Sequence, residues 1–358
     1  MTLPPDIRLL YDAVATPSFS THEHAVAQVL TTAMAERGIA SHIDRVGNVV
    51  GTVGTRGPQI VLLGHIDTAP GTVPVRIVED VLYGRGSVDA KGAFCAFIAA
   101  AARLAAVPEL PFRLTLIGAV EEEYATSRGA HYAAKQYRPD ACIIGEPSGA
   151  DRVTLGYKGR VLVTVTTHLP SAHSAGATAS APEQCMAIWQ RIQAYCSAYN
   201  HDKPRLFDQY LPSLRQISSG SDGLYEWASA TIGIRLPSAR PPWQLIADIG
   251  TYGDEHTTLL FRDVSPAWQS SRSDAAATAF GAAIRAQGRT PGVIVKTGTA
   301  DMNVVGPVWR CPIIAYGPGD ATLDHTPDEH LSISEYLQAI AILTDALPRL
   351  AQRLGSSS

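Results

Sequence analysis

The stretch QIVLLGHID at residues 59–67 is an apolar run that ends in two polar side chains, His65 and Asp67. Its residues are apolar almost throughout rather than at every second position, which is typical of a strand buried on both faces of a parallel sheet. Residues 91–107 are Ala-rich and apolar on nearly every side, so they predict a helix packed beneath that sheet. Three further runs have the character of the first: FRLTLIGAVEEE at 112–123, ACIIGEP at 141–147 and CPIIAYGPG at 311–319. Strands alternating with helices indicate an α/β layered domain with a largely parallel sheet.

A different pattern fills the middle of the chain. Residues 160–167 (RVLVTVTT) alternate between apolar and polar side chains, as a strand with one exposed face does. An amphipathic helix pattern follows at 182–199, and a further strand pattern at 229–236. Strand, helix and strand with one open face predict a small α+β domain, inserted at 156–265 into the larger one.

The larger domain is then formed by residues 1–155 and 266–358. Its sequence contains two more helical patterns. Apolar residues recur at helical spacing from Pro5 to Gly38 and again at 273–287. The first stretch ends at a glycine, which suits the C-terminus of a helix.

The composition fits a soluble globular enzyme. The chain has 358 residues, enough for two domains, of which 46% are hydrophobic and 17% charged. A formal net charge of -4 argues against nucleic acid as the main partner, because phosphate binding needs a basic surface. The cysteines are scattered without a C-x-x-C spacing, so they predict neither a disulfide framework nor a cysteine zinc site. The sequence shows no signal-peptide pattern and no apolar run of the roughly 18 residues that span a membrane, so we expect a cytoplasmic protein without a membrane partner.

Four of the predicted strands lead into side chains that can bind metals. Ligands of open α/β sheets bind outside the carboxyl ends of the strands. His65 and Asp67 are two residues apart and so point to the same face, which lets Asp67 orient the imidazole. Glu121–Glu123 follow the second strand, where a bound cation would offset the crowded negative charge. Glu146 follows the third strand, and His325 lies in a polar loop after the fourth.

Each signal has a simpler explanation when it is taken alone. His65 can be a buried histidine bonded to a loop aspartate, and a run of three glutamates is usually a solvated surface. Asp89, in the Gly-flanked stretch YGRGSVDAKGA at 83–93, can be the N-cap of the helix that follows. The order and spacing of these residues carry more information than any one of them.

In that order the motifs resemble the M20 metallopeptidase family, which includes acetylornithine deacetylase and succinyl-diaminopimelate desuccinylase. The matching motifs run through nearly the whole chain: G-H-x-D at 64–67, G-R-G-x-x-D-x-K-G at 84–92, an E-E pair, G-E-P-S at 145–148 and H-T-P-D-E at 325–329. The resemblance implies a phosphorylase/hydrolase-like zinc-peptidase catalytic domain with an inserted α+β lid and dimerisation domain.

The resemblance also implies a ligand set for two Zn²⁺ ions per chain, with Co²⁺ as a possible substitute. His65 and Glu146 would hold one ion, Glu123 and His325 the other, and Asp89 would bridge the two. Two histidines and three carboxylates supply the N and O ligands that Zn²⁺ accepts. Such a centre would make the chain a metal-dependent amidohydrolase.

Two carboxylates take other roles by the same resemblance. Asp67 would orient the first histidine ligand, and Glu122 would be the general base that acts on the attacking water. The Gly129-Ala130 pair that follows fits Glu122 and Glu123 as base and ligand better than Glu121 and Glu122, and the register stays open.

The inserted domain carries two further candidates. Ala172-His173-Ser174 resembles the family's lid histidine, which in dimers reaches into the partner's active site and stabilises the tetrahedral oxyanion. Arg235 resembles the lid arginine that binds a substrate carboxylate, a task that suits a bidentate guanidinium. An exposed loop histidine and a surface strand arginine are the alternatives. The resemblance thus implies a homodimer.

Within the family, the motifs resemble the lysine-biosynthesis branch often called LysK. Its members release lysine or ornithine from the C-terminal glutamate side chain of a small acidic carrier protein, LysW. Gly298 and Thr299 would then donate to the α-carboxylate of the product, unless their loop binds no ligand. The motifs concerned are V-D-A-K-G at 88–92, V-E-E-E at 120–123, G-Y-K-G-R at 156–160 and K-T-G-T-A-D-M-N at 296–303.

Three alternatives remain for the chain as a whole. It can be an N-acetylornithine or N-acetyl-lysine deacetylase, or another M20 carboxypeptidase or dipeptidase. A non-catalytic binding protein on the same scaffold is the third, and it should have lost ligands or the base. No ligand or base of the family pattern is missing here.

Overall fold

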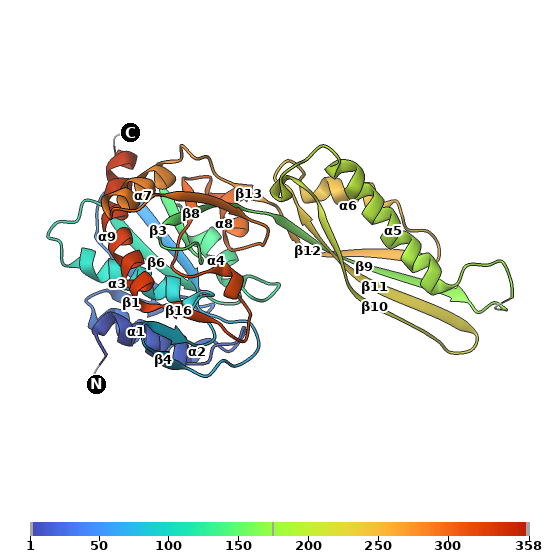
Figure 1. Ribbon diagram of the computed structural model, residues 1–358, viewed down its shortest axis with the longest axis horizontal. Helices are drawn as coiled ribbons and strands as arrows, with labels where there is room; N and C mark the ends of the chain where they lie inside the picture. The colour runs from blue at the N-terminus through green and yellow to red at the C-terminus, as the bar shows by residue number, and fades with distance from the viewer. Residues whose placement is uncertain (1–2, 174, 356–358) are drawn as a thin grey trace. The chain divides into compact units, whose positions relative to one another are not determined.

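The computed structural model describes residues 3–173 and 175–355, which divide into two compact units (Figure 1). Unit 1 contains the described residues up to Gly156, Ser270–Val295, and those from Ala300 onward. Unit 2 contains Tyr157–Gln269 and Lys296–Thr299. Unit 2 therefore ends later than the range 156–265 expected for an inserted domain, and it includes a short second segment that the sequence analysis placed in the larger domain.

The main sheet of unit 1 is built from the four continuous apolar runs. Its parallel strands lie in the order β6-β3-β7-β15, so that strands distant in the chain are neighbours in space. From Ile60 onward every residue of β3 is buried, which explains why the run is apolar at consecutive positions. The central strands are β3 (Gln59–His65), β6 (Arg113–Ala119), β7 (Ala141–Gly145) and β15 (Ile313–Ala315). The sheet continues through β2 (Val49–Val53) and β1 (Ala40–Ile43) on one side and β8 (Arg152–Tyr157) with β14 (Gly292–Lys296) on the other.

Helices pack against this sheet, and a second, smaller sheet lies in the same unit. Helix α3 (Lys91–Ala105) packs against both β3 and the C-terminal helix α9 (Ile333–Gly355), and α7 (Ala275–Ala286) also packs against α9. The small antiparallel sheet pairs β5 (Val81–Tyr83) with β4 (Arg76–Val78) and β16 (His330–Ser332). The remaining helices of the unit are α1 (Pro5–Ala15), α2 (His24–Glu36), α4 (Arg128–Gln136) and α8 (Met302–Trp309), with a 3-10 turn at Ala321–Leu323.

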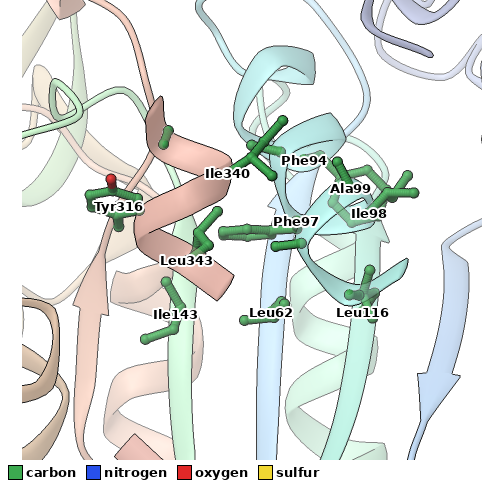
Figure 2. Packing of buried hydrophobic residues seen from close by; sticks show 14 of the residues in the cluster. Leu62, Phe94, Phe97, Ile98, Ala99, Leu116, Ile143, Tyr316, Ile340 and Leu343 are labelled. Atoms are coloured by element: carbon green, nitrogen blue, oxygen red, sulfur yellow. The ribbon is translucent and has the colours of Figure 1, made fainter. Parts of the chain in front are cut away.

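The core of unit 1 lies between α3, α9 and the central strands. Figure 2 shows Phe94 and Phe97 of α3 among Leu62, Leu116 and Ile143, which come from three neighbouring strands. All five side chains are fully buried. Burial of each contributes roughly 1.5–3 kcal/mol to folding, so this layer fixes α3 on the sheet.

A row of glycines lets the two phenylalanines approach the sheet. Gly118, Gly64 and Gly145 are register partners across β6, β3 and β7. A Cβ at Gly118 would lie 2.8 Å from the ring of Phe94, and one at Gly145 would lie 2.9 Å from the ring of Phe97. The row comes directly before the segments that carry the predicted ligands, so helix packing and ligand placement are set at the same level of the sheet.

The helical pattern at 5–38 forms two helices rather than one. Thr16 ends α1 in an extended conformation, because it precedes Pro17 and proline disfavours the helical conformation in the residue before it. The chain then runs close to the loop after β3, where the main-chain N–H of Thr68 donates to the Ser18 carbonyl at 2.9 Å. Helix α2 begins only at His24.

Unit 2 is an antiparallel sheet with its own core. The strand order is β10-β11-β9-β12, and the inward-facing residues of β9 alternate with more exposed ones, as its sequence predicted. Val161, Val163 and Val165 of β9 pack in a core that includes Cys185 and Trp189 of α5. The elements are β9 (Gly159–Pro170), α5 (Ala181–Asn200), a 3-10 turn at Leu206–Asp208, β10 (Leu211–Ser221), β11 (Tyr225–Leu236), α6 (Pro242–Gly250), β12 (Thr257–Ser265) and β13 (Trp268–Gln269). Among the described residues of both units, no helix combines the length and apolarity needed to cross a membrane.

Candidate metal centre

The predicted ligands of unit 1 meet at the carboxyl end of the parallel strands. His65 is the last residue of β3, Glu123 lies in the turn after β6, and Glu146 directly follows β7. His325 lies in the loop between β15 and β16. Asp89 lies between β5 and α3; the N-cap of α3 is Ala90, and no side chain caps that helix end. The N-cap alternative for Asp89 is therefore wrong.

Asp89 stands between two groups of potential ligands. One oxygen, Oδ1, lies 3.1 Å from Nε2 of His65, which in turn is 3.8 Å from Oε1 of Glu146. The other oxygen, Oδ2, lies 3.0 Å from Nε2 of His325, which is 2.8 Å from Oε1 of Glu123. Each group of three offers ligand atoms that all lie within 4.8 Å of one another. The carboxylate of Asp89 thus faces a histidine and a glutamate on each side.

The electrostatics of these groups favour a bound cation. Although burial raises the pKa of Asp89, hydrogen bonds with His325 and His65 hold that pKa well below its usual range. Hydrogen bonds with Asp89 and Glu123 raise the pKa of His325 to about 10. For His65, burial lowers the pKa, but the hydrogen bonds with its aspartate neighbours outweigh burial and raise it well above its ordinary value. Protons on the two imidazoles offset the negative charge of the carboxylates. Divalent metal ions bound by neutral imidazoles would replace these protons and offset the same charge.

The turn after β6 separates the three consecutive glutamates. Glu123 belongs to the second ligand group. Glu121 points to other partners: its carboxylate forms an ion pair with Arg128 at 2.8 Å and accepts a hydrogen bond from Thr126. Glu122 belongs to neither ligand group, and desolvation raises its pKa well above the ordinary value. Of the three glutamates, only Glu123 therefore stands among the candidate ligands.

Asp67 contacts more of the site than the sequence indicated. Nδ1 of His65 lies 3.0 Å from the main-chain oxygen of Asp67 and 3.4 Å from its Oδ1. The same carboxylate accepts the main-chain N–H groups of Glu122 and Glu123, both at 3.0 Å, and the hydroxyl of Ser20 at 2.7 Å. Asp67 thus holds both the first histidine and the glutamate turn. The backbone contacts have no side-chain signature, so no motif predicted them.

Two buried carboxylates were quoted within motifs but were given no role. Glu329, in H-T-P-D-E, accepts three main-chain N–H groups of the segment that carries Asp89. Asp301, in K-T-G-T-A-D-M-N, is buried, and among the described residues neither of its carboxylate oxygens has a hydrogen-bond partner. Desolvation raises its pKa to about 7. Their burial, rather than their spacing to other motifs, distinguishes them, and burial is not visible at a single polar position in a sequence.

The remaining predicted residues lie in unit 2. His173 is exposed, and its Nδ1 accepts the main-chain N–H of Ala175 at 3.2 Å; Ser174 lies outside the described residues. Arg235 of β11 donates from Nη1 to the hydroxyl of Thr299 at 3.1 Å. Gly298 has open space where a Cβ would stand. Arg235 and Thr299 thus meet although they are distant in sequence, because segment 296–299 belongs to unit 2.

Comparison with known proteins identifies the family. Residues 61–349 match the family model described as peptidase family M20/M25/M40. The chain belongs to this family. It is 44% identical to the [LysW]-lysine hydrolase of Deinococcus radiodurans, over 98% of this chain and 99% of that protein. A protein of Pyrococcus abyssi, named provisionally as a [LysW]-lysine/[LysW]-ornithine hydrolase, is 34% identical over 98% of this chain and 96% of its own.

Solved structures agree with this assignment at the level of the fold. The M20 family metallo-carboxypeptidase Sso-CP2 of Sulfolobus solfataricus superimposes with a TM-score of 0.81 at 17% identity, covering 98% of this chain and all of that one. A Bacillus subtilis structure described as a dinuclear metal binding peptidase of the M20 family gives a TM-score of 0.68 at 14% identity, covering 97% and 96%. As an M20 member with two groups of candidate ligands, the chain is a metal-dependent amidohydrolase.

Proposed function

We propose that the protein hydrolyses the amide bond that joins lysine or ornithine to a small carrier protein of the LysW type, at a centre of two Zn²⁺ ions. The observation that carries the chemistry is the position of Asp89, with one oxygen facing His65 and the other facing His325. The support for the substrate is the 44% identity to a [LysW]-lysine hydrolase over nearly the whole of both chains. Release of lysine would serve lysine biosynthesis, and release of ornithine would serve arginine biosynthesis. We also propose that it acts in the cytoplasm, as a homodimer.

Zinc bound at this centre would polarise the amide carbonyl and promote deprotonation of water. Glu122, whose pKa burial raises, suits the proton transfer that follows: it accepts a proton from the attacking water and delivers it to the leaving amine. Asp67 keeps Glu122 in place through the main-chain bond at 3.0 Å and holds Nδ1 of His65, so that Nε2 faces the metal site. These assignments need no residue outside unit 1.

Four residues of unit 2 would act on the substrate. Arg235 and Thr299, which already contact each other, would bind the α-carboxylate of the amino acid, with the main chain of Gly298 as a further donor. His173 would donate to the oxyanion in the partner subunit's site. A donor directed at developing charge contributes roughly 3–4 kcal/mol to transition-state stabilisation.

The test is to incubate the purified protein with competing substrates and to quantify each free amino acid by mass spectrometry. The panel contains LysW carrying lysine, LysW carrying ornithine, N-acetyl-lysine, N-acetylornithine and a dipeptide. We expect release from the two LysW conjugates to exceed release from the acetylated amino acids, and the matched variant Glu122→Gln to release neither. Faster turnover of an acetylated substrate would instead assign the deacetylase activity.

A further inference from the structure

Glu329 is a fully buried carboxylate. Its Oε1 accepts the main-chain N–H groups of Gly86 at 2.8 Å, Val88 at 3.1 Å and Asp89 at 3.2 Å. Its Oε2 lies 2.6 Å from Nη1 of Arg85, which is itself almost buried. Every partner of this side chain therefore belongs to one five-residue segment, 85–89.

That segment ends with the carboxylate that faces both histidines. The direction of the Asp89 side chain depends on the main chain from Gly86 to Asp89, which Glu329 holds at three points. Gly86 has a φ of +82°, and a Cβ there would lie 2.5 Å from Lys91 and 2.7 Å from Thr68, so the segment has little freedom to adopt a different path. A shift of this main chain would turn both oxygens of Asp89 at once.

Glu329 also belongs to the segment that supplies the second histidine. It lies four positions after His325 and immediately before β16, whose His330 pairs with Tyr83 of β5. The main-chain N–H of Gly84 donates to the Glu329 carbonyl at 3.2 Å. The main chain and the side chain of one residue thus tie the segment of Asp89 to the segment of His325, although about 240 positions separate their contacts in sequence.

From this geometry we infer that Glu329 is a positioning residue of the metal centre. It fixes the main chain of Asp89 relative to His325, so that one carboxylate can serve two metal ions at once. A purely structural ion pair with Arg85 would engage the side chain of Arg85 alone and would not place the remaining oxygen on three main-chain donors of a ligand segment. The inference rests on the proposed role of Asp89 as the bridging ligand.

The test measures zinc affinity, because activity alone would not separate positioning from catalysis. Metal-free full-length protein is titrated with Zn²⁺ against a competing chelator for the wild type, Glu329→Gln and a matched control, Asp274→Asn. Asp274 is a half-buried carboxylate of unit 1 that accepts the main-chain N–H of Ala276 at 2.8 Å and contacts no predicted ligand. We expect about 10-fold to 100-fold weaker zinc binding for Glu329→Gln, as is usual when a residue that orients a ligand is lost. The control should stay within about threefold of the wild type.

A second readout reports the geometry of the metal site rather than the strength of metal binding. The visible absorption spectrum of the Co²⁺-loaded protein depends on the arrangement of its ligands, so it should change in Glu329→Gln and not in Asp274→Asn. If Glu329→Gln does not fold, Glu329→Asp replaces it, since Asp keeps the buried charge beside Arg85 and is one methylene too short to reach all its partners. Wild-type zinc affinity and an unchanged Co²⁺ spectrum in a folded variant would overturn the inference. Failure of the wild type itself to bind Zn²⁺ would instead refute the proposed function.

Discussion

A methyl group added at Gly145 tests how the core positions the candidate metal ligand beside it. Gly145 ends β7 and directly precedes Glu146. A Cβ there would lie 2.9 Å from Cε2 of Phe97 and 3.1 Å from Cα of Gly64, closer than packed carbon atoms approach. Because β7 pairs with β3 on one side and β15 on the other, the strand cannot move aside without breaking a ladder. We expect Gly145→Ala to lower the free energy of unfolding by about 1–3 kcal/mol, the usual cost of overpacking, and to weaken zinc binding through Glu146.

The same contact provides a second-site test. Phe97→Leu removes the ring edge that the new methyl group would meet, at its own cost of about 1–2 kcal/mol for the lost burial. In the double variant the two costs should not add, and the coupling should favour the pair by at least about 1 kcal/mol. Denaturant unfolding of the metal-free wild type, both single variants and the double variant measures this cycle. Gly250→Ala is the control, since its Cβ would have its nearest neighbour at 3.8 Å. Additive costs, or a Gly145→Ala protein as stable as the wild type, would refute the packing argument.

Three further predictions concern the site. Glu122→Gln should keep its metal and lose about 10²-fold to 10⁴-fold in kcat, whereas Glu123→Gln should weaken metal binding; a base-like loss in Glu121→Gln would show that the register is off by one. Zinc affinity should rise with pH by about one logarithmic unit per pH unit for each proton displaced. The reason is that His325, with its pKa raised to about 10, must lose a proton before it can bind metal. A zinc affinity that stays constant from about pH 6 to about pH 9 would contradict this prediction. If His173 acts across a dimer, mixing inactive His173→Ala with inactive Glu122→Gln after reversible dissociation should restore part of the activity, whereas action within one subunit restores none.

The sequence predicted the sheet of unit 1 because a strand that is buried on both faces is apolar at consecutive positions. Each of the four apolar runs forms a strand, and each prediction extended past the observed end of the strand into the residues of the following loop. In the run at 112–123, for example, β6 ends at Ala119 and Glu121 has a φ of +61°, outside any strand. The parallel order then brings the loop residues together, and this placement follows from the rule for open α/β sheets.

Strand β10 of unit 2 was harder to predict than β9 and β11, which the patterns at 160–167 and 229–236 had indicated. Residues 211–221 (LPSLRQISSGS) form β10 although most of them are exposed and their apolar residues do not alternate. This strand exists because it pairs along its whole length with β11, with an irregularity between Leu214 and Gln216. Pairing with a neighbour leaves no apolar signature in the strand itself, so local sequence patterns do not reveal such an edge.

The helical pattern at 5–38 is interrupted next to the predicted site. A continuous helix at 5–38 would have matched the apolar spacing, but the chain leaves the helix at residues 16–23. That break brings the Ser20 hydroxyl to Asp67 and the Glu23 carboxylate to the main-chain N–H of Glu121, at 2.7 Å and 3.1 Å. The break follows from the local rule at Thr16-Pro17, and the segment between the two helices contacts the predicted site.

Glu23, Asp67 and Glu329 share a role that residue patterns describe poorly. Each is a buried carboxylate whose partners include main-chain N–H groups of segments that carry a predicted base or ligand. A main-chain donor is the same at every residue except proline, so the chemistry of the partner leaves no mark in the sequence. What does leave a mark is the acceptor, an acidic residue in an otherwise apolar stretch or at the end of a motif. Acidic motif residues that remain after the ligands and the base have been assigned are therefore the positions at which to look for the scaffold of a metal centre.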